Sequence, residues 1–147
     1  PFSAGMTVNI LQILRLMCHI QTNNLQEVLV LIEAWIKEIK KRSAPEALGM
    51  ILVHNGIVRA TSKQGKPVRR MRTTYNASKL DATIALLKQK DGIADIKVWI
   101  NEGILQVGDD IMKVCVAGRF RIDVLPVFQE LLAAIKSEII KEEEYPL

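Results

Sequence analysis

The residue types best able to bind an anion are concentrated in the middle of this 147-residue chain. No Asp or Glu lies between Glu46 and Asp81, whereas that interval is rich in cations. They are Arg59, Lys63, Lys66, Arg69, Arg70, Arg72 and Lys79. Because arginine presents a planar fork of N–H donors that matches phosphate and carboxylate oxygens, the pattern indicates an anion site. A solvated loop and an exposed sheet face would give the same pattern, so both interpretations stay open.

A second group of cations lies further along the chain. Arg119 and Arg121 follow a predicted strand and precede a predicted helix, whose first N–H groups favour anions. Lys136 lies 15 positions after Arg121 on that helix, close to its apolar stripe, and is expected to be partly buried. A lysine near apolar surface and other cations can act as a nucleophile or a proton donor. A surface lysine that extends its amine into water is the commoner alternative.

Composition and motifs exclude several other kinds of site. The two cysteines and two histidines show no zinc-ligand spacing, and we expect no metal and no cofactor. Cys18 and Cys115 are interpreted as reduced, buried thiols of a cytoplasmic protein. His54 lies inside an apolar run and is interpreted as a structural histidine. No phosphate-binding loop or nucleophile elbow occurs, and the apolar segment 8–20 is too short and too polar to span a membrane.

The elements that must position these residues follow from the apolar spacing. Strand pairs separated by helices predict an α+β fold, a single domain with a mostly antiparallel sheet and helices packed on it. The predicted elements are helix 24–42, strands 50–58 and 68–75, helix 76–91, strands 96–100 and 111–117, and helix 123–139. Asn24 and Asp123 are the predicted N-caps of the first and last helices. Residues 1–23 are interpreted as an extension, partly an expression remnant; 24–147 form the domain, with a loose tail at 141–147.

Two stretches of the sequence resemble the catalytic (large) subunit family of molybdopterin synthase. Segment 49–59 is similar to that family's early strand, with a glycine, an apolar run and then Gly56-x-Val-Arg59. Segment 103–121 is similar, without gaps, to the family's Gly-x-x-x-Val-Gly-(Asp/Glu) hairpin, its next strand and its His-Arg pair. Lys136 then stands at the matching distance from Arg121. The resemblance covers about residues 49–144, although 60–100 match only in pattern.

The resemblance implies an α/β-hammerhead-like fold and a sulfur-transfer reaction without a metal. In this family a small ubiquitin-like sulfur carrier brings sulfur as a thiocarboxylate on its C-terminal glycine. Two sulfur atoms are added to cyclic pyranopterin monophosphate to form the dithiolene of molybdopterin. The expected assembly is a homodimer of this chain within a heterotetramer, located in the cytoplasm, with no nucleic acid and no membrane as partner.

The same resemblance implies roles for individual residues. Arg59 and Arg121 would hold the substrate phosphate or the carrier carboxylate, and Lys136 would be the central catalytic lysine. The family's second catalytic lysine is assigned to Lys141, although an ungapped alignment places Glu143 there. The family histidine before the arginine is Phe120 in this sequence, so its proton-transfer or hydrogen-bonding role is lost or moved. Arg119 is an additional cation that we expect to bind substrate and to compensate for that histidine.

Three alternatives remain at this point. A divergent family member would bind the carrier without normal catalysis, as the phenylalanine at position 120 suggests. A small basic nucleic-acid-binding module would explain the cations at 59–72, although only 5% of residues are aromatic and no such motif is found. A structural interaction protein would use the same charges merely to solvate its surface.

Overall fold

The computed structural model describes the backbone of residues 25–146 and the side chains from residue 31 to 146. The chain divides into two compact units, Pro1–Glu33 and Ala34–Leu147. The first unit contributes only the start of helix α2 (Leu25–Arg42) to the described residues. The predicted extension 1–23, with Cys18, and the predicted cap Asn24 lie outside the described residues. All that follows concerns the second unit.

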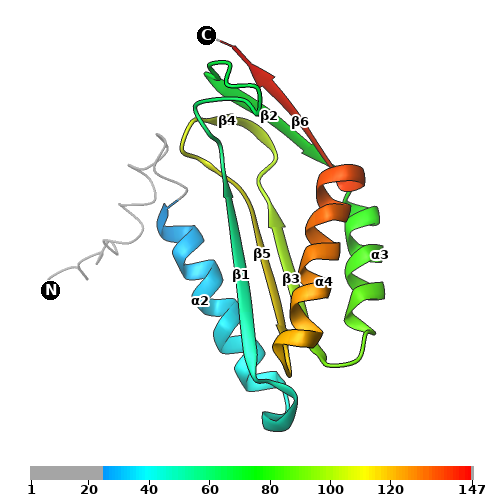
Figure 1. Cartoon of the computed structure of the whole chain (residues 1–147). Coiled ribbons are helices and arrows are strands. Elements are labelled where there is room, and N and C mark those ends of the chain that lie inside the picture. Colours follow the sequence, from blue (N-terminus) through cyan, green and yellow to red (C-terminus); the bar gives the residue numbers. More distant parts are fainter. Residues whose placement is uncertain (1–24, 147) are drawn as a thin grey trace, which may run out of the picture. The chain divides into compact units, whose positions relative to one another are not determined.

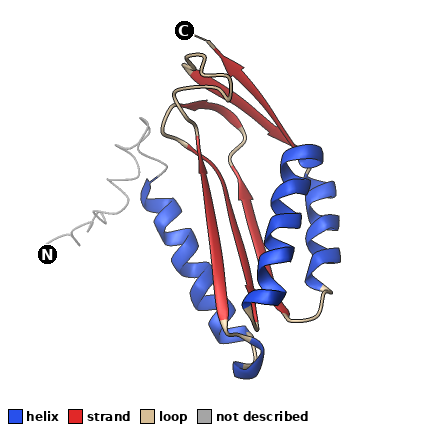
Figure 2. Cartoon of the chain, in the orientation of Figure 1, coloured by secondary structure: helices blue, strands red, loops and turns tan. Residues whose placement is uncertain are grey.

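The main sheet of the second unit has three strands in the order β1-β5-β3 (Figures 1 and 2). They are β1 (Met50–Ile57), β5 (Asp110–Gly118) and β3 (Ile93–Ile100), and β5 pairs antiparallel with both neighbours. All nine residues of β5 are buried. This central position explains why the 111–117 segment reads as an almost unbroken apolar run.

Helices cover both faces of this sheet. On one face α3 (Ala77–Lys88) and α4 (Arg121–Ala134) lie side by side (Figure 1). Alternation along β5 sends Met112, Val114 and Val116 into the core under these two helices, whereas Cys115 and Ala117 pack with Ile39 of α2 on the opposite face. The structure therefore confirms the predicted α+β class with a mostly antiparallel sheet and packed helices.

A second, smaller sheet has the order β4-β2-β6. It consists of β4 (Gly103–Gln106), β2 (Arg70–Tyr75) and β6 (Ile140–Tyr145), again antiparallel throughout. The prediction of a loose tail at 141–147 was wrong, because β6 pairs with β2 from Ile140 to Tyr145. Ladder hydrogen bonds and the burial of Ile140 stabilise this charged segment, and neither can be recognised from its local composition. Residues 103–106, which lie between the predicted strands 96–100 and 111–117, also form a strand.

The last helix differs from its prediction at both ends. Its N-cap is Phe120, which makes no side-chain capping bond, and the predicted cap Asp123 lies inside the first turn. Its regular part ends at Ala134, and Ile135–Ile139 form a π-helical turn, η2, before β6 begins. Asp123 was wrong as a cap because its carboxylate instead accepts a bond from Arg119. The π-helical turn carries the lysine that the sequence singles out, and such turns occur frequently at functional sites.

Candidate active site

Helix α4 separates the two cations that the sequence places in one site. Arg121 is its first residue, whereas Lys136 lies on η2, just beyond its last residue (Figure 1). Fifteen residues at about 1.5 Å per residue put roughly 22 Å between their backbones. One copy of the chain therefore does not bring Arg121 and Lys136 to the same small molecule.

Lys136 forms an ion pair with Glu142, near the start of strand β6. Its Nζ donates a hydrogen bond to Oε1 of Glu142. The lysine side chain is 48% exposed, so the prediction of a partly buried lysine was wrong. The π-helical geometry of η2 and the return of the chain as β6 bring this acid within reach six residues later. The amine is thus held in place and still accessible to a ligand.

His54 is a second titratable group of this site. Burial lowers the pKa of its imidazole below the ordinary value, and the positive charge of Lys136 lowers the pKa further. The ring meets Phe128 of α4 edge-on, with 6.3 Å between the ring centroids and 69° between the planes. Among the described residues its imidazole has no hydrogen-bond partner. The sequence interpretation of a satisfied structural histidine missed this placement, because only the tertiary fold relates β1 to η2.

Arg59 lies two residues past the C-terminal end of β1, and His54 lies in the C-terminal half of that strand. The side chain is exposed, and its Nε donates a hydrogen bond of 2.8 Å to the backbone oxygen of Thr61. The other cations of the predicted anion site are also exposed: Lys63, Lys66 and Arg69 on the following loop, Arg70 and Arg72 on β2, and Lys79 on α3. Arg59 therefore belongs to the same end of the main sheet as His54 and Lys136, and Arg121 does not.

Arg119 forms two ion pairs at the other end of the sheet. Its guanidinium bonds Asp91 at 3.1 Å and Asp123 at 3.3 Å, and it also lies over the ring of Phe120 at 5.2 Å from the centroid. Hydrogen bonding to Asp91 is the main cause of the raised pKa of this guanidinium. These contacts tie the start of α4 to the loop between α3 and β3. Arg121, two residues on, is exposed on the first turn of α4.

Lys141 lies on β6 and is 77% exposed, with Glu143 at 3.7 Å. Side chains alternate along a strand, so Lys141 and Glu143 project from one face of β6 and Glu142 from the other. Lys136 bonds Glu142, so its amine lies at the face of β6 opposite to the side chain of Lys141. The structure thus places Lys136, His54 and Arg59 at one end of the main sheet, with Lys141 on the outside of the smaller sheet.

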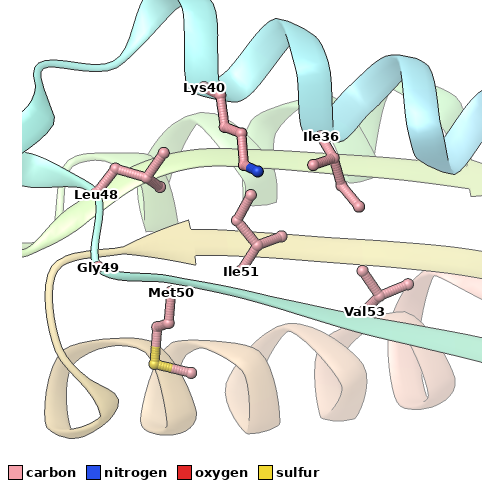
Figure 3. Close-up of a pocket in the computed structure, with 7 residues that line it drawn as sticks. All are labelled: Ile36, Lys40, Leu48, Gly49, Met50, Ile51 and Val53. Atoms are coloured by element: carbon pink, nitrogen blue, oxygen red, sulfur yellow. The ribbon is translucent and has the colours of Figure 1, made fainter.

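A groove of about 380 Å³ lies away from these residues, between the second half of α2 and β1 (Figure 3). Its lining is apolar apart from Lys40, whose side chain extends from α2 toward Ile51. His54, Lys136 and Arg59 do not line this groove. Among the described residues no cluster of three or more His, Cys, Asp or Glu has the arrangement of a metal site, and no described helix is both long and apolar enough to cross a membrane.

The fold can be compared with solved structures. The chain is 19% identical to molybdopterin synthase from Staphylococcus aureus, with a TM-score of 0.62 over 76% of this chain and 84% of that one. It is 16% identical to a chain of the complex of subunits 1 and 2 of the molybdopterin-converting factor from Helicobacter pylori, with a TM-score of 0.65 over 84% and 80%. It is also 19% identical to a MoaE protein of molybdopterin biosynthesis from Burkholderia ambifaria, with a TM-score of 0.60 over 79% of both chains. At these identities the likeness establishes the fold.

The family itself is established by sequence. The family model for MoaE protein matches residues 28–138, which include the main sheet, β2 and β4 of the smaller sheet, and the lysine of the candidate site, whereas β6 lies beyond the match. A comparison with curated proteins gave no match. The fold is thus the α+β fold of molybdopterin synthase structures. The chain belongs to the MoaE protein family, and this membership supports a role in molybdopterin biosynthesis.

Proposed function

We propose that this chain is the catalytic subunit of a molybdopterin synthase. It transfers sulfur from the thiocarboxylated C-terminus of a small ubiquitin-like carrier to cyclic pyranopterin monophosphate, and the dithiolene of molybdopterin is the product. The observation that carries the proposal is family membership combined with an accessible lysine, Lys136, which the sequence resemblance matches to the family's central lysine. A cytoplasmic location is part of the proposal.

The charges around this site fit both anionic ligands. The substrate is a phosphate, and the carrier brings a thiocarboxylate and leaves as a carboxylate. Arg59 and the cations of the following loop are exposed at the same end of the main sheet as Lys136. A bound anion near a lysine ammonium and an arginine fork gains charge-assisted hydrogen bonds, which are about twice as strong as neutral ones. Glu142 keeps the lysine positioned until the ligand arrives.

Arg121 enters this scheme through a second copy of the chain. The length of α4 prevents Arg121 and Lys136 of one copy from meeting the same substrate. We therefore assign Arg121 to the site of a neighbouring copy in a homodimer, with a carrier bound at each end. Arg119 then stabilises the start of α4 through its ion pairs with Asp91 and Asp123. Lys141, on the outer face of β6, is assigned to the carrier rather than to the pterin.

The H. pylori structure of subunits 1 and 2 supports a small partner for proteins of this fold. That complex belongs to the H. pylori protein, and we extend a partner of this kind to the present chain as part of the proposal. We propose that the glycine-terminated tail of the carrier reaches the exposed amine of Lys136, since glycine carries no side chain to obstruct a close approach.

The proposal is tested with purified chain, thiocarboxylated carrier and cyclic pyranopterin monophosphate. Dithiolene formation is followed for the unmodified protein, for Lys136→Ala, and for the matched surface control Lys41→Ala on α2. We expect product from the unmodified protein and from Lys41→Ala, and a loss of about 100-fold or more for Lys136→Ala. Carrier binding without product from the unmodified protein would favour the divergent, non-catalytic alternative. Full activity of Lys136→Ala would remove the lysine from the mechanism.

A further inference from the structure

We propose that His54 is the general base of the Lys136 site and activates the water that releases the carrier after each sulfur transfer. This inference rests on the proposed function and assigns a role to a residue that the sequence suggested was only structural. The role is the one that Phe120, at the position of the family histidine, has no proton-accepting atom to perform.

The position of the ring is determined by β1 and α4. Met50 and Leu52 pack into the core under the helices, and alternation along β1 sends His54 to that same face. There the edge-on contact with Phe128 limits rotation of the imidazole. Lys136 lies on η2, eight residues after Phe128, and its amine bonds Glu142. Its positive charge is near enough to the imidazole to lower the pKa of His54.

One edge of the ring is left open by a glycine. Gly56 is two residues from His54 on the same face of β1, where a Cβ would lie 3.4 Å from Nε2 of the histidine and 3.3 Å from Cγ of Met112. A larger residue at position 56 would cover Nε2. A purely structural buried histidine normally has its ring nitrogens satisfied by hydrogen bonds. His54 instead is partly buried, and no described residue bonds its imidazole.

The charge environment keeps this base in its neutral form. The charged groups of the site are Lys136 on η2 and its partner Glu142 on β6; α4 contributes the apolar Phe128, and β5 contributes the apolar Val114, which pairs with His54. Burial and the lysine charge both disfavour the imidazolium, so the pKa of His54 lies below its ordinary value of 6.5. At neutral pH the ring is therefore ready to accept a proton.

The chemical step requires such an acceptor. After the thiocarboxylate sulfur has bonded to a substrate carbon, the carrier is joined to the substrate through an acyl–sulfur bond. Water attacks the acyl carbon, the bond between carbon and sulfur breaks, and the electron pair stays on sulfur as a thiolate on the pterin. One proton of the water passes to His54 Nε2 during attack, and the other leaves the carboxylic acid for solvent. Lys136, as an ammonium, stabilises the developing oxyanion and thiolate.

Arg119, the other residue considered as a replacement for the family histidine, lies at the opposite end of α4. Its guanidinium is bound to Asp91 and Asp123, and an arginine keeps its proton at any physiological pH. It therefore lacks both the position and the chemistry of a base for Lys136 of the same copy. His54 has both within one chain.

A single-turnover experiment tests this role with the complete complex. The chain, thiocarboxylated carrier and cyclic pyranopterin monophosphate are mixed from about pH 5 to about pH 8. Mass spectrometry of the intact carrier follows the carrier–substrate adduct and the free carrier carboxylate separately. His54→Phe keeps an aromatic ring against Phe128 and removes both nitrogens. His54→Gln keeps a polar group and provides the same measurement where the first variant fails to fold, and Lys41→Ala is the surface control.

We expect His54→Phe and His54→Gln to form the adduct at the unmodified rate and to release the carrier about 100-fold more slowly, so that the adduct accumulates. The acid limb of the release rate, with its midpoint below pH 6.5 in the unmodified protein, disappears in both variants. Unchanged release and pH profile, or equal slowing of both steps in a folded variant, would overturn the assignment. Neither adduct nor product from the unmodified protein would instead contradict the proposed function, and the inference with it.

Discussion

The substitution Asp110→Ala is expected to destabilise the protein strongly, because it leaves a buried lysine without its counter-ion. Nζ of Lys113 lies 3.2 Å from Oδ2 of Asp110 and 3.3 Å from Oδ1 of Asn55. Nδ2 of Asn55 in turn donates to Oδ1 of Asp110 at 2.9 Å. The lysine side chain is 3% exposed and the aspartate side chain 10% exposed, so water replaces little of a lost contact.

The magnitude follows from this burial. Removal of one partner of a buried ion pair costs about 3–5 kcal/mol, since the remaining charge stays desolvated. After Asp110→Ala the ammonium would retain only the amide oxygen of Asn55 among its two present partners. For a chain of this length, about 3–4 °C of melting temperature corresponds to 1 kcal/mol, so the expected decrease is about 10–20 °C. The double variant Asp110→Ala/Lys113→Met removes both charges and should recover most of the loss.

Urea unfolding and thermal melting of the two single variants and the double variant measure this coupling directly. The matched control is Lys90→Ala, which breaks the exposed pair of Lys90 and Glu130. That pair should contribute about 1 kcal/mol or less. If Asp110→Ala lowers stability no more than Lys90→Ala does, or if the double variant is as unstable as the sum of the single ones, the reasoning about the buried network is refuted.

Three further predictions concern buried residues. Thr73 is fully buried and its Oγ1 has no hydrogen-bond partner among the described residues, so Thr73→Val should raise the free energy of unfolding by about 1 kcal/mol; a loss of stability would reveal a partner for the hydroxyl. Gly118→Ala would place a Cβ 2.3 Å from the backbone oxygen of Gly92, and a folded variant with an unchanged melting temperature would contradict that close approach. Burial, with Asp95 adding to it, raises the pKa of the Cys115 thiol from 9.0 to about 11, so its thiolate is about 100-fold rarer and alkylation in a Cys18→Ser background should be at least that much slower than after unfolding. Rapid labelling of the folded protein would refute it.

The sequence predicts the main sheet well because its strands carry their own signals. The apolar run of 111–117 corresponds to β5, which is buried on both faces, and the apolar run that begins at Met50 corresponds to β1. The strand β6 could not be predicted in this way. Its four consecutive charged residues, Lys141 to Glu144, have the composition of a solvated tail, and only pairing with β2 makes them a strand. Non-local pairing of this kind leaves no periodic pattern within the segment itself.

The candidate site shows the same limit. Lys136, Arg59 and Arg121 can be singled out from charge and resemblance, and the predicted last helix already separates Arg121 from Lys136. Only the fold shows that Arg59, just after β1, lies toward the Lys136 end of that helix. His54 was overlooked because an apolar run suggests a structural residue, whereas its relation to Lys136 depends on how β1 packs against α4. Arg119 is prominent in the sequence because it lies two residues before Arg121, yet its guanidinium forms ion pairs with Asp91 and Asp123.

We propose that this chain moves sulfur from a carrier onto a pterin. The most direct measurement uses carrier labelled with radioactive sulfur in its thiocarboxylate, together with cyclic pyranopterin monophosphate and the purified chain. We expect two labelled sulfur atoms in each dithiolene formed, with two carriers converted to the carboxylate form, and we expect Lys136→Ala to leave the label on the carrier. Label that stays on the carrier with the unmodified protein, although carrier and substrate are both bound, would contradict the claim.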